Sequence, residues 1–378
     1  MRVRVIADML EEKWPSMDLF ADMLVDYLPQ CSVPVNVELF RLPLKRRLAR
    51  IFGTRSTTID RLVGRHFDYP RELRRRGPSG DIDHIVDQTY AASALSLRAE
   101  RTVITCHDLD AFSPLNASAP RVGDRMLSAL ATRTLSGLRL AAHVVCDAET
   151  VKNELVIRGW VPAERISVIP AGVHPSFSNR AESSGDGNIA RLLGTPDGPE
   201  MLHVGSTIPR KRIDTLLEAL AGVRKHRDDV RLLRAGGAFT DTQRQMMARL
   251  GLTGAVITLP FLSRLDLAAL YRRATLVVLP SQSEGFGLPL IEAMACGTPV
   301  LASNLDVFRE VAGEATAYAA VGDSRDWTRA MLAMLDERER SPDSWGDRIA
   351  RGRQHSRQFS WQEHARRLSQ VYDTVLSR

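Results

Sequence analysis

Residues 276–303 read LVVLPSQSEGFGLPLIEAMACGTPVLAS, and this stretch decides the fold that the sequence predicts. An apolar run ends near Pro280, a polar loop carries Glu284, and Pro289 is well placed as the first residue of a helix. Gly297 ends that helix, and the next apolar run follows directly. A strand, a loop, a helix and a second strand in this order are typical of a parallel α/β sheet.

Apolar runs of strand length recur on both sides of a polar, glycine-containing segment at 179–198. Helical patterns separate the runs, which predicts two parallel sheets, each covered by helices on both faces. The runs are VRVIA, HIVDQ, TVITC, HVVCD and ISVIP before the segment, and MLHVG, VRLLRAGG, VITLP, LVVLP and PVLAS after it. We expect residues 1–175 to form one domain, 176–199 a linker and 200–356 a second domain.

The composition bounds the class of protein. The chain has 378 residues, of which 44% are hydrophobic and 25% are charged, and this excludes disordered, collagen-like and low-complexity classes. The four cysteines lie far apart, without the spacing of a zinc or redox site. The first residues lack the apolar core of a signal peptide, and no stretch approaches the roughly 18 apolar residues of a membrane span. We therefore expect a cytoplasmic protein.

The basic charge is concentrated in residues 41–76. This segment holds 12 Lys and Arg against three acids, a local excess of nine charges, whereas the whole chain has a net charge of +6. Three interpretations stay open: docking on an anionic membrane surface through Arg74, Arg75 and Arg76, a solvated face without a partner, and nucleic-acid binding. Nucleic acid is disfavoured because no series of aromatic residues accompanies the charge.

The loops that follow the strands should carry the chemistry, because open α/β sheets bind ligands beyond the carboxyl ends of their strands. Glu284 and Glu292, with seven residues between them, can accept hydrogen bonds from the hydroxyls of a bound sugar and ribose. Gly285 and Gly287 let the backbone approach a ligand, and the helix start after them favours a diphosphate. The alternative is that Glu284 caps the helix and Glu292 is a surface residue.

Two further strands end in polar groups. Arg210, Lys211 and Arg212 follow the strand MLHVG and open a helix, where they could hold phosphates or form only a solvated helix start. His107 and Asp108 directly follow the strand TVITC, where a histidine is either structural or part of a site.

The chain resembles a known family along nearly its whole length, although weakly at 41–76. Its SEGFGLPLIEAMACGTPV stretch is similar to the E-x7-E signature of the retaining GT-B glycosyltransferases of family 4. VITCHDLDAF resembles the family's HD segment, VIPAGVHPSF its inter-domain segment, VGSTIPRKRIDTLLEAL its VGxxxPRKN segment and FSWQEHA its closing helix. The resemblance implies two Rossmann-like domains that face each other across a cleft, with a C-terminal helix at 357–378 that crosses back to the first domain.

The resemblance also implies an activity. It implies retaining transfer of a hexose from a nucleotide-diphosphate sugar, held mainly by the second domain, to a glycan or lipid-linked saccharide held mainly by the first. The segments look most like bacterial mannosyl- or rhamnosyltransferases of surface-polysaccharide assembly, so GDP-mannose is the leading donor. We expect no cofactor and no metal, because no DxD pair or His/Cys cluster stands at a strand end. A peripheral position on the inner face of the membrane would fit the basic segment.

The resemblance assigns roles by position. It implies that Lys211, with Arg210, holds the donor diphosphate, and that His107 approaches the reacting centre without acting as a general base. The expected catalytic residues are His107, Asp108, Lys211 and Glu284, and the expected donor-binding residues are Gly205, Arg210, Lys211, Glu284, Gly285, Phe286, Gly287, Leu288 and Glu292.

The sequence departs from the family's pattern after the first strand. Many relatives carry a glycine-rich loop there, whereas this chain reads ADMLEEKWPSMDLF, and Ala171 replaces the usual inter-domain Asn. A sugar-nucleotide epimerase of similar fold is the rival enzyme, but its acids and bases cannot be assigned. A nucleotide-binding or membrane scaffold without turnover is the rival of another class. A dehydrogenase is disfavoured because no G-x-G-x-x-G follows the first strand.

Overall fold

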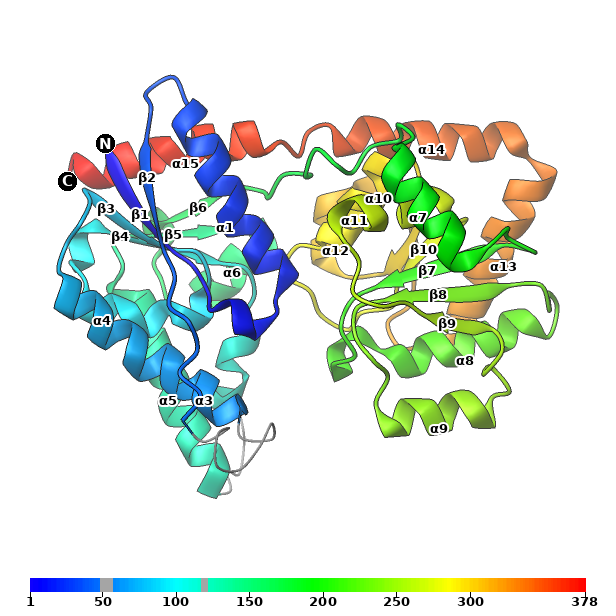
Figure 1. Ribbon diagram of the computed structural model, residues 1–378, viewed down its shortest axis with the longest axis horizontal. Coiled ribbons are helices and arrows are strands. Elements are labelled where there is room, and N and C mark those ends of the chain that lie inside the picture. Colours follow the sequence, from blue (N-terminus) through cyan, green and yellow to red (C-terminus); the bar gives the residue numbers. More distant parts are fainter. Residues whose placement is uncertain (48–56, 117–121) are drawn as a thin grey trace. The chain divides into compact units, whose positions relative to one another are not determined.

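The computed structural model describes residues 1–47, 57–116 and 122–378 (Figure 1). The chain forms two compact units, each described by itself: unit 1 comprises Met1–Gly172 and Ser360–Arg378, and unit 2 comprises Val173–Phe359. No helix in the described ranges is both long and apolar enough to cross a membrane. Residues 48–56 of the basic segment lie outside the described residues.

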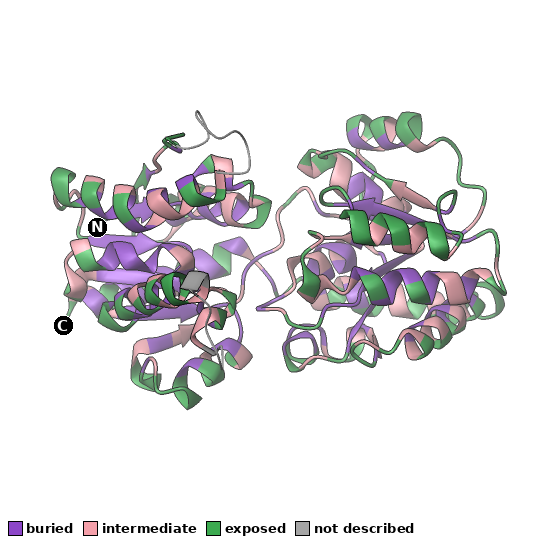
Figure 2. Cartoon of the chain, turned by 90° about the horizontal axis from the view of Figure 1, so that it is seen from below, coloured by how far each residue is buried: buried purple, intermediate pink, exposed green. Residues whose placement is uncertain are grey.

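Unit 1 is built on a six-stranded parallel sheet in the order β2-β1-β3-β4-β5-β6. The strands are β1 (Arg2–Ile6), β2 (Asn36–Phe40), β3 (Ile82–Ile85), β4 (Thr102–Cys106), β5 (His143–Cys146) and β6 (Ile166–Val168). The central strands β3, β4 and β5 are buried at every position, as expected for a sheet covered on both faces (Figure 2). Strand β3 reads IDHI and begins two residues before the predicted run HIVDQ.

Helices cover both faces of this sheet. They are α1 (Pro15–Tyr27), α3 (Thr57–Val63), α4 (Tyr69–Arg76), α5 (Val122–Leu140), α6 (Glu149–Ile157) and α15 (Trp361–Leu376). Helix α1 packs beside α15, and Figure 1 shows the sheet between this pair and the helices α4 and α5. A π-helical turn at Gly64–Asp68 joins α3 to α4.

The last helix returns to unit 1, which confirms the sequence prediction. The side chains of Trp361, Leu368, Val371, Tyr372 and Val375 in α15 are all buried. The Tyr372 hydroxyl lies 2.6 Å from Nδ1 of His84 in β3, and Nε2 of His84 lies 2.8 Å from the Thr105 hydroxyl in β4. Three hydrogen-bonded side chains within the core therefore fix the helix against two strands.

Unit 2 repeats the architecture, with the parallel strand order β12-β11-β10-β7-β8-β9. The strands are β7 (Glu200–Val204), β8 (Arg231–Ala235), β9 (Val256–Thr258), β10 (Leu276–Leu279), β11 (Val300–Ser303) and β12 (Ala317–Ala319). Strand β7, the first in sequence, pairs with both β8 and β10, so the strand order reverses between β7 and β10. In doubly wound sheets this switch point is where ligands bind.

Eight α-helices in the described part of unit 2 flank this sheet. They are α7 (Ser183–Leu193), α8 (Ile213–Arg224), α9 (Asp241–Arg249), α10 (Arg264–Arg273), α11 (Leu288–Cys296), α12 (Asp306–Ala312), α13 (Ser324–Arg340) and α14 (Pro342–Ser356). Helices α8 and α13 bury an apolar core against β7, β8 and β10, with Trp327 of α13 fully buried within it.

The segment at 176–199 differs from the expected linker. It belongs to unit 2 and contains helix α7, which packs against α10. Glu182 caps the helix by accepting from the Gly185 amide at 2.7 Å, and Asp186 pairs with Arg272 at 2.5 Å. Gly185 permits close packing, since a Cβ there would lie 2.6 Å from the Leu265 carbonyl oxygen. Gly185 thus serves the contact between α7 and α10.

Replacing Tyr372 by Phe should lower the free energy of unfolding by about 1–3 kcal/mol, because it leaves one buried nitrogen of His84 without a partner. The measurement is the urea-unfolding midpoint. Thr374→Ala, on the exposed face of the same helix, is the matched control and should change the stability by less than about 0.5 kcal/mol. Equal stability of Tyr372→Phe and the wild type would contradict this account of the helix anchor.

Candidate donor site

The candidate site lies at the switch point of unit 2, where the loops after β7 and β10 meet. The loop after β7 forms a short 3-10 turn, Pro209–Lys211. The Arg210 carbonyl accepts from the Gln282 amide at 2.7 Å, and Nη1 of Arg210 donates to the Ser283 carbonyl at 2.9 Å. The two loops are therefore bonded to each other through both backbone and side chain.

Glu284 is the centre of this site. Its Oε1 accepts from Nζ of Lys211 at 2.5 Å and from the Ser281 hydroxyl at 2.6 Å. Its Oε2 accepts from Nη1 of Arg210 at 2.8 Å. One carboxylate is thus shared by two cations from a loop more than 70 residues away in sequence.

The electrostatics keep this cluster charged. Burial alone raises the pKa of Glu284, but Lys211 and Arg210 outweigh it, and the net effect lowers the pKa below its usual value. The cluster therefore carries two positive charges and one negative charge at neutral pH. A bound anion can accept hydrogen bonds from Lys211 or Arg210 in place of Glu284. This arrangement therefore suits a phosphate group next to a carboxylate that accepts hydrogen bonds from hydroxyls.

The sequence predicts that Arg210, Lys211 and Arg212 open a helix, and the structure differs. Arg210 and Lys211 lie on the 3-10 turn, and α8 begins only at Ile213. Arg212 lies between the turn and α8, in a left-handed conformation with a φ of 46°, and its side chain bonds to Asp214 at 2.8 Å. The turn therefore directs only Arg210 and Lys211 to Glu284.

The start of α11 is shaped by glycine. Gly287 has a φ of 101°, a conformation that favours glycine, and a Cβ there would lie 2.7 Å from the Phe308 ring. No side chain caps this helix, so the structure contradicts the alternative that Glu284 is its cap. The ring of Phe286 is buried against Phe359, at a centroid distance of 5.7 Å. Gly285 is buried and Leu288 is half-buried beside it.

Glu292 is a buried residue, so the alternative that it lies on the surface is also wrong. It lies in α11 and accepts from the Tyr271 hydroxyl of α10 at 2.9 Å. Burial raises the pKa of Glu292 to about 7, although the bond from Tyr271 lowers it. A carboxyl group with this pKa can exchange its proton near neutral pH.

A third cation beside the site escaped the sequence analysis. Arg234 near the end of β8 is fully buried, and its guanidinium donates to the carbonyl of Gly205 at 2.9 Å. The sequence does carry a signal for it: Arg234 interrupts the apolar run of VRLLRAGG one residue before two glycines.

Unit 1 holds a second set of polar strand ends. Nδ1 of His107 lies 2.5 Å from the Asp147 carboxylate, and its Nε2 lies 2.7 Å from the Val86 carbonyl. Burial lowers the pKa of His107, but Asp147 and Asp87 outweigh burial and raise this pKa to about 9. Both ring nitrogens therefore carry protons and donate within the fold, which leaves His107 no free lone pair to act as a base.

The pairing of His107 with Asp147 follows from strand register. Cys106 of β4 pairs directly with Cys146 of β5, so His107 and Asp147 occupy equivalent positions after neighbouring strands. Asp108, in contrast, accepts from the side chain of Gln88 at 3.0 Å. Of the two residues of the HD motif, His107 therefore forms an ion pair and Asp108 forms a loop contact.

The loop after β1 is acidic. Arg65, from the π-helical turn, bonds to the buried Glu12 at 2.7 Å and stacks over Trp14 at 5.1 Å. Asp8 lies beside Asp87, and burial together with this neighbour raises the pKa of Asp8 well above its usual value. Buried carboxyls at this point of the first sheet are unfavourable for a phosphate.

The three basic residues predicted to contact a membrane lie at the exposed end of α4. Arg75 and Arg76 both pair with Glu72, at 2.6 and 2.9 Å, and Arg74 bonds to the Ser96 hydroxyl at 3.0 Å. The structure therefore keeps these charges at the surface and neutralises part of them.

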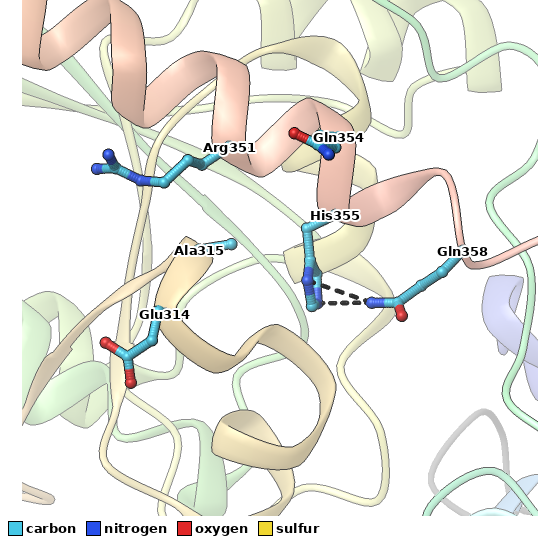
Figure 3. A pocket seen from close by; sticks show the side chains of 6 residues that line it. All are labelled: Glu314, Ala315, Arg351, Gln354, His355 and Gln358. Atoms are coloured by element: carbon cyan, nitrogen blue, oxygen red, sulfur yellow. Dashed lines mark hydrogen bonds between the residues drawn. The ribbon is translucent and has the colours of Figure 1, made fainter.

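A recess of about 370 Å³ in unit 2 does not coincide with the candidate site. Figure 3 shows the side chains around it, which come from the 3-10 turn Gly313–Ala315, from α14 and from the residues after α14: Glu314, Ala315, Arg351, Gln354, His355 and Gln358. His355 is held there by a 2.7 Å bond from Nε2 to the Val311 carbonyl. The recess includes no residue that the sequence or the cation cluster singles out.

Two α/β units, each with a parallel six-stranded sheet and helices on both faces, define the GT-B class of protein. Known structures support this fold at low sequence identity. Sucrose-phosphate synthase from Thermosynechococcus elongatus matches with a TM-score of 0.74 at 19% identity, over 100% of this chain and 99% of that one. Anabaena Alr3699/HepE, in complex with UDP and glucose, matches with a TM-score of 0.73 at 18% identity, over 99% and 100%.

Two family models together cover most of the chain. The model described as "Glycosyltransferase Family 4" matches residues 25–177, and the model described as "Glycosyl transferases group 1" matches residues 189–351. The chain therefore belongs to group 1 of the glycosyltransferases, family 4.

Curated relatives match over part of their length. A D-inositol 3-phosphate glycosyltransferase of Thermobispora bispora is 31% identical over 63% of this chain and 57% of that protein. A phosphatidyl-myo-inositol mannosyltransferase of Mycobacterium leprae is 35% identical over 50% of this chain and 52% of that protein. The chain thus spans about half the length of the curated relatives it matches.

The raised pKa of His107 predicts a pH-dependent stability. The folded state binds this proton more tightly than the unfolded state, whose histidine has a pKa near 6.5. The contribution is fully present below about pH 6.5 and is lost as pH rises through about 9; at about 1.4 kcal/mol per pKa unit it reaches about 3 kcal/mol at most.

The measurement is the difference in urea-unfolding free energy between the wild type and His107→Gln from pH 6 to pH 10. This difference should shrink as pH rises, and Asp147→Asn should remove most of the same pH dependence. A difference that stays constant across this range would show that His107 is not held as a cation.

Proposed function

We propose that this protein is a retaining glycosyltransferase that moves a hexose from a nucleotide-diphosphate sugar to a hydroxyl group. The single observation that carries the proposal is the sharing of Glu284 between Lys211 and Arg210 at the switch point of unit 2. The cations suit the diphosphate, and the carboxylate suits the sugar hydroxyls. Membership of family 4 supports the reaction class.

The proposed reaction needs few protein groups. The bond between the anomeric carbon and the diphosphate oxygen breaks, the acceptor oxygen bonds to the same face of that carbon, and the departing phosphate takes the acceptor's proton. Lys211 and Arg210 stabilise the charge that develops on the leaving group. His107, with both ring nitrogens engaged, would contribute through its backbone carbonyl or its positive charge rather than as a base.

Glu292 would bind the ribose of the donor. Its carboxyl group lies on the same helix that Gly287 starts, eight residues after Glu284. An ionised carboxylate accepts from both ribose hydroxyls, and the bond from the Tyr271 hydroxyl favours the ionised form against the burial that raises the pKa of Glu292 to about 7. Gly205, Gly285, Phe286 and Leu288 complete the proposed donor site.

The proposed donor is a nucleotide-linked mannose-type sugar, and the proposed acceptor is a saccharide. A mannose-type donor, GDP-mannose first, is supported by the relative named a mannosyltransferase. Unit 2 would hold the donor, and unit 1, with His107 and Asp108, would hold a glycan or lipid-linked saccharide acceptor. The exposed arginines of α4 would place the protein on the cytoplasmic face of an anionic membrane.

Nucleotide sugars should stabilise the protein against heat, and a ligand at 100 times its dissociation constant adds about 2.7 kcal/mol.

With the donor identified in this way, Lys211→Met should lower turnover by about a hundredfold, because it removes one cation from the leaving group. Lys225→Met, an exposed lysine at the end of α8, is the matched control and should leave turnover within about twofold of the wild type.

Product analysis decides between the rival functions. Release of the nucleotide with a new glycosidic bond supports the transferase. A changed sugar still attached to its nucleotide would show an epimerase, and binding without turnover in the presence of saccharide acceptors would show a scaffold.

The vesicle test concerns the basic helix. Replacing Arg74, Arg75 and Arg76 by Gln should weaken binding to phosphatidylserine-containing vesicles by about a hundredfold, at about 1 kcal/mol for each basic residue near the surface. The control replaces three exposed arginines of α13: Arg329, Arg338 and Arg340. Equal vesicle binding of the α4 variant and the wild type would remove the membrane contact from the proposal.

A further inference from the structure

Arg234 is a buried cation without an acidic partner. It lies in β8 opposite His203 of β7, and its side chain is fully buried. Across the described part of the chain no ion pair to a carboxylate is found for it, and burial alone lowers its pKa, to about 10. The guanidinium therefore stays charged at neutral pH, in a place where an unpaired charge is unfavourable.

Its hydrogen bonds go to backbone carbonyls at the carboxyl end of the sheet. Nη2 donates to the carbonyls of Gly205 at 2.9 Å and Gly236 at 3.2 Å, and Nη1 donates to that of Gly237 at 3.1 Å. The aliphatic and planar parts of the side chain lie against Phe239, 5.2 Å from its ring centroid. One side chain thus holds the glycine loops after both β7 and β8.

Arg234 and Lys211 lie on either side of the same glycine. The Gly205 carbonyl bonds to Arg234, while a Cβ on Gly205 would lie 3.7 Å from Cε of Lys211. Both cations act on His203: after burial, Arg234 and then Lys211 lower the pKa of this histidine well below its usual value. Arg234 therefore belongs to the electrostatic neighbourhood of the candidate site.

The carbonyls explain why a buried cation is useful here. The carboxyl ends of parallel strands present backbone oxygens, whose partial negative charge repels an anion. Arg234 bonds to three of these oxygens and adds a full positive charge beneath them. With Arg210 and Lys211 the site then holds three cations against the one carboxylate of Glu284, an excess of two charges, which a diphosphate would balance.

We propose that Arg234 is the positioning residue of the diphosphate site: it turns the carbonyls of Gly205, Gly236 and Gly237 away from the ligand and supplies the charge behind Lys211. This inference rests on the proposed function and deepens it. The geometry of the loops supports the arrangement, since a Cβ on Gly236 would lie 2.2 Å from the Gly205 carbonyl oxygen, and only glycine permits that approach.

The test compares diphosphate and nucleoside binding. Inorganic pyrophosphate and the nucleoside diphosphates of uridine, guanosine and adenosine are titrated by calorimetry, each nucleoside alone serving as the phosphate-free reference. Arg234→Met should weaken diphosphate and pyrophosphate binding at least tenfold and leave nucleoside binding within twofold. Its unfolding midpoint should fall, because the carbonyls of Gly205, Gly236 and Gly237 lose their donor, so the ratio of diphosphate to nucleoside affinity is the deciding readout.

Two variants complete the test. Arg273→Met removes a half-buried arginine of unit 2, which pairs with the buried Glu200 at the opposite end of β7; it should lower the unfolding midpoint and leave diphosphate binding unchanged. Arg234→Lys restores the charge without the fork that reaches three carbonyls, so diphosphate affinity should be intermediate.

The outcomes separate this inference from the proposed function. A wild type that binds neither pyrophosphate nor any of the three nucleoside diphosphates overturns the proposed function, and the role of Arg234 with it. If the wild type binds them and Arg234→Met has the same ratio of diphosphate to nucleoside affinity as the wild type, only the role of Arg234 is overturned. If Arg234→Met does not fold, Arg234→Lys decides, and an unchanged preference overturns the inference.

Discussion

The candidate donor site depends on one interaction: the carboxylate of Glu284 is shared between Lys211 and Arg210. Neither cation is exposed enough to be satisfied by water alone, and the carboxylate is held in its ionised form by both. Such a cluster is stable without a ligand and still carries a net positive charge. In the proposed function, a diphosphate replaces the carboxylate on the cations and the carboxylate becomes free to accept hydroxyl groups.

The sheet topology explains why these residues meet. Strand β7 pairs with β10, so the loops after them leave the sheet side by side although 73 residues separate Lys211 from Glu284. The strand on the other side of β7 is β8, which carries Arg234. The loop after β7 contributes Arg210 and Lys211, the loop after β10 contributes Glu284, and β8 contributes Arg234. The corresponding strand ends in unit 1 carry the acidic residues Asp8 and Asp87 and the Asp147-bound His107. This contrast supports a donor diphosphate on unit 2.

Much of the fold could be predicted from the sequence, because central parallel strands are continuous apolar runs. The strands that the sequence analysis missed, β2 and β12, are both edge strands and only partly buried, so they lack that signal. Glu284 and Lys211 could be predicted as site residues from their loops. Their ion pair, and the roles of Asp147 and Arg234, depend on which strands lie side by side, and this register cannot be read from periodicity along one chain.

The most direct test of the central claim is a crystal structure of the protein with the nucleoside diphosphate that stabilises it most. The account predicts diphosphate oxygens within hydrogen-bond distance of Nζ of Lys211 and the guanidinium of Arg210, with Glu284 no longer bonded to both cations. A diphosphate bound elsewhere, with the carboxylate still shared between the two cations, would contradict it.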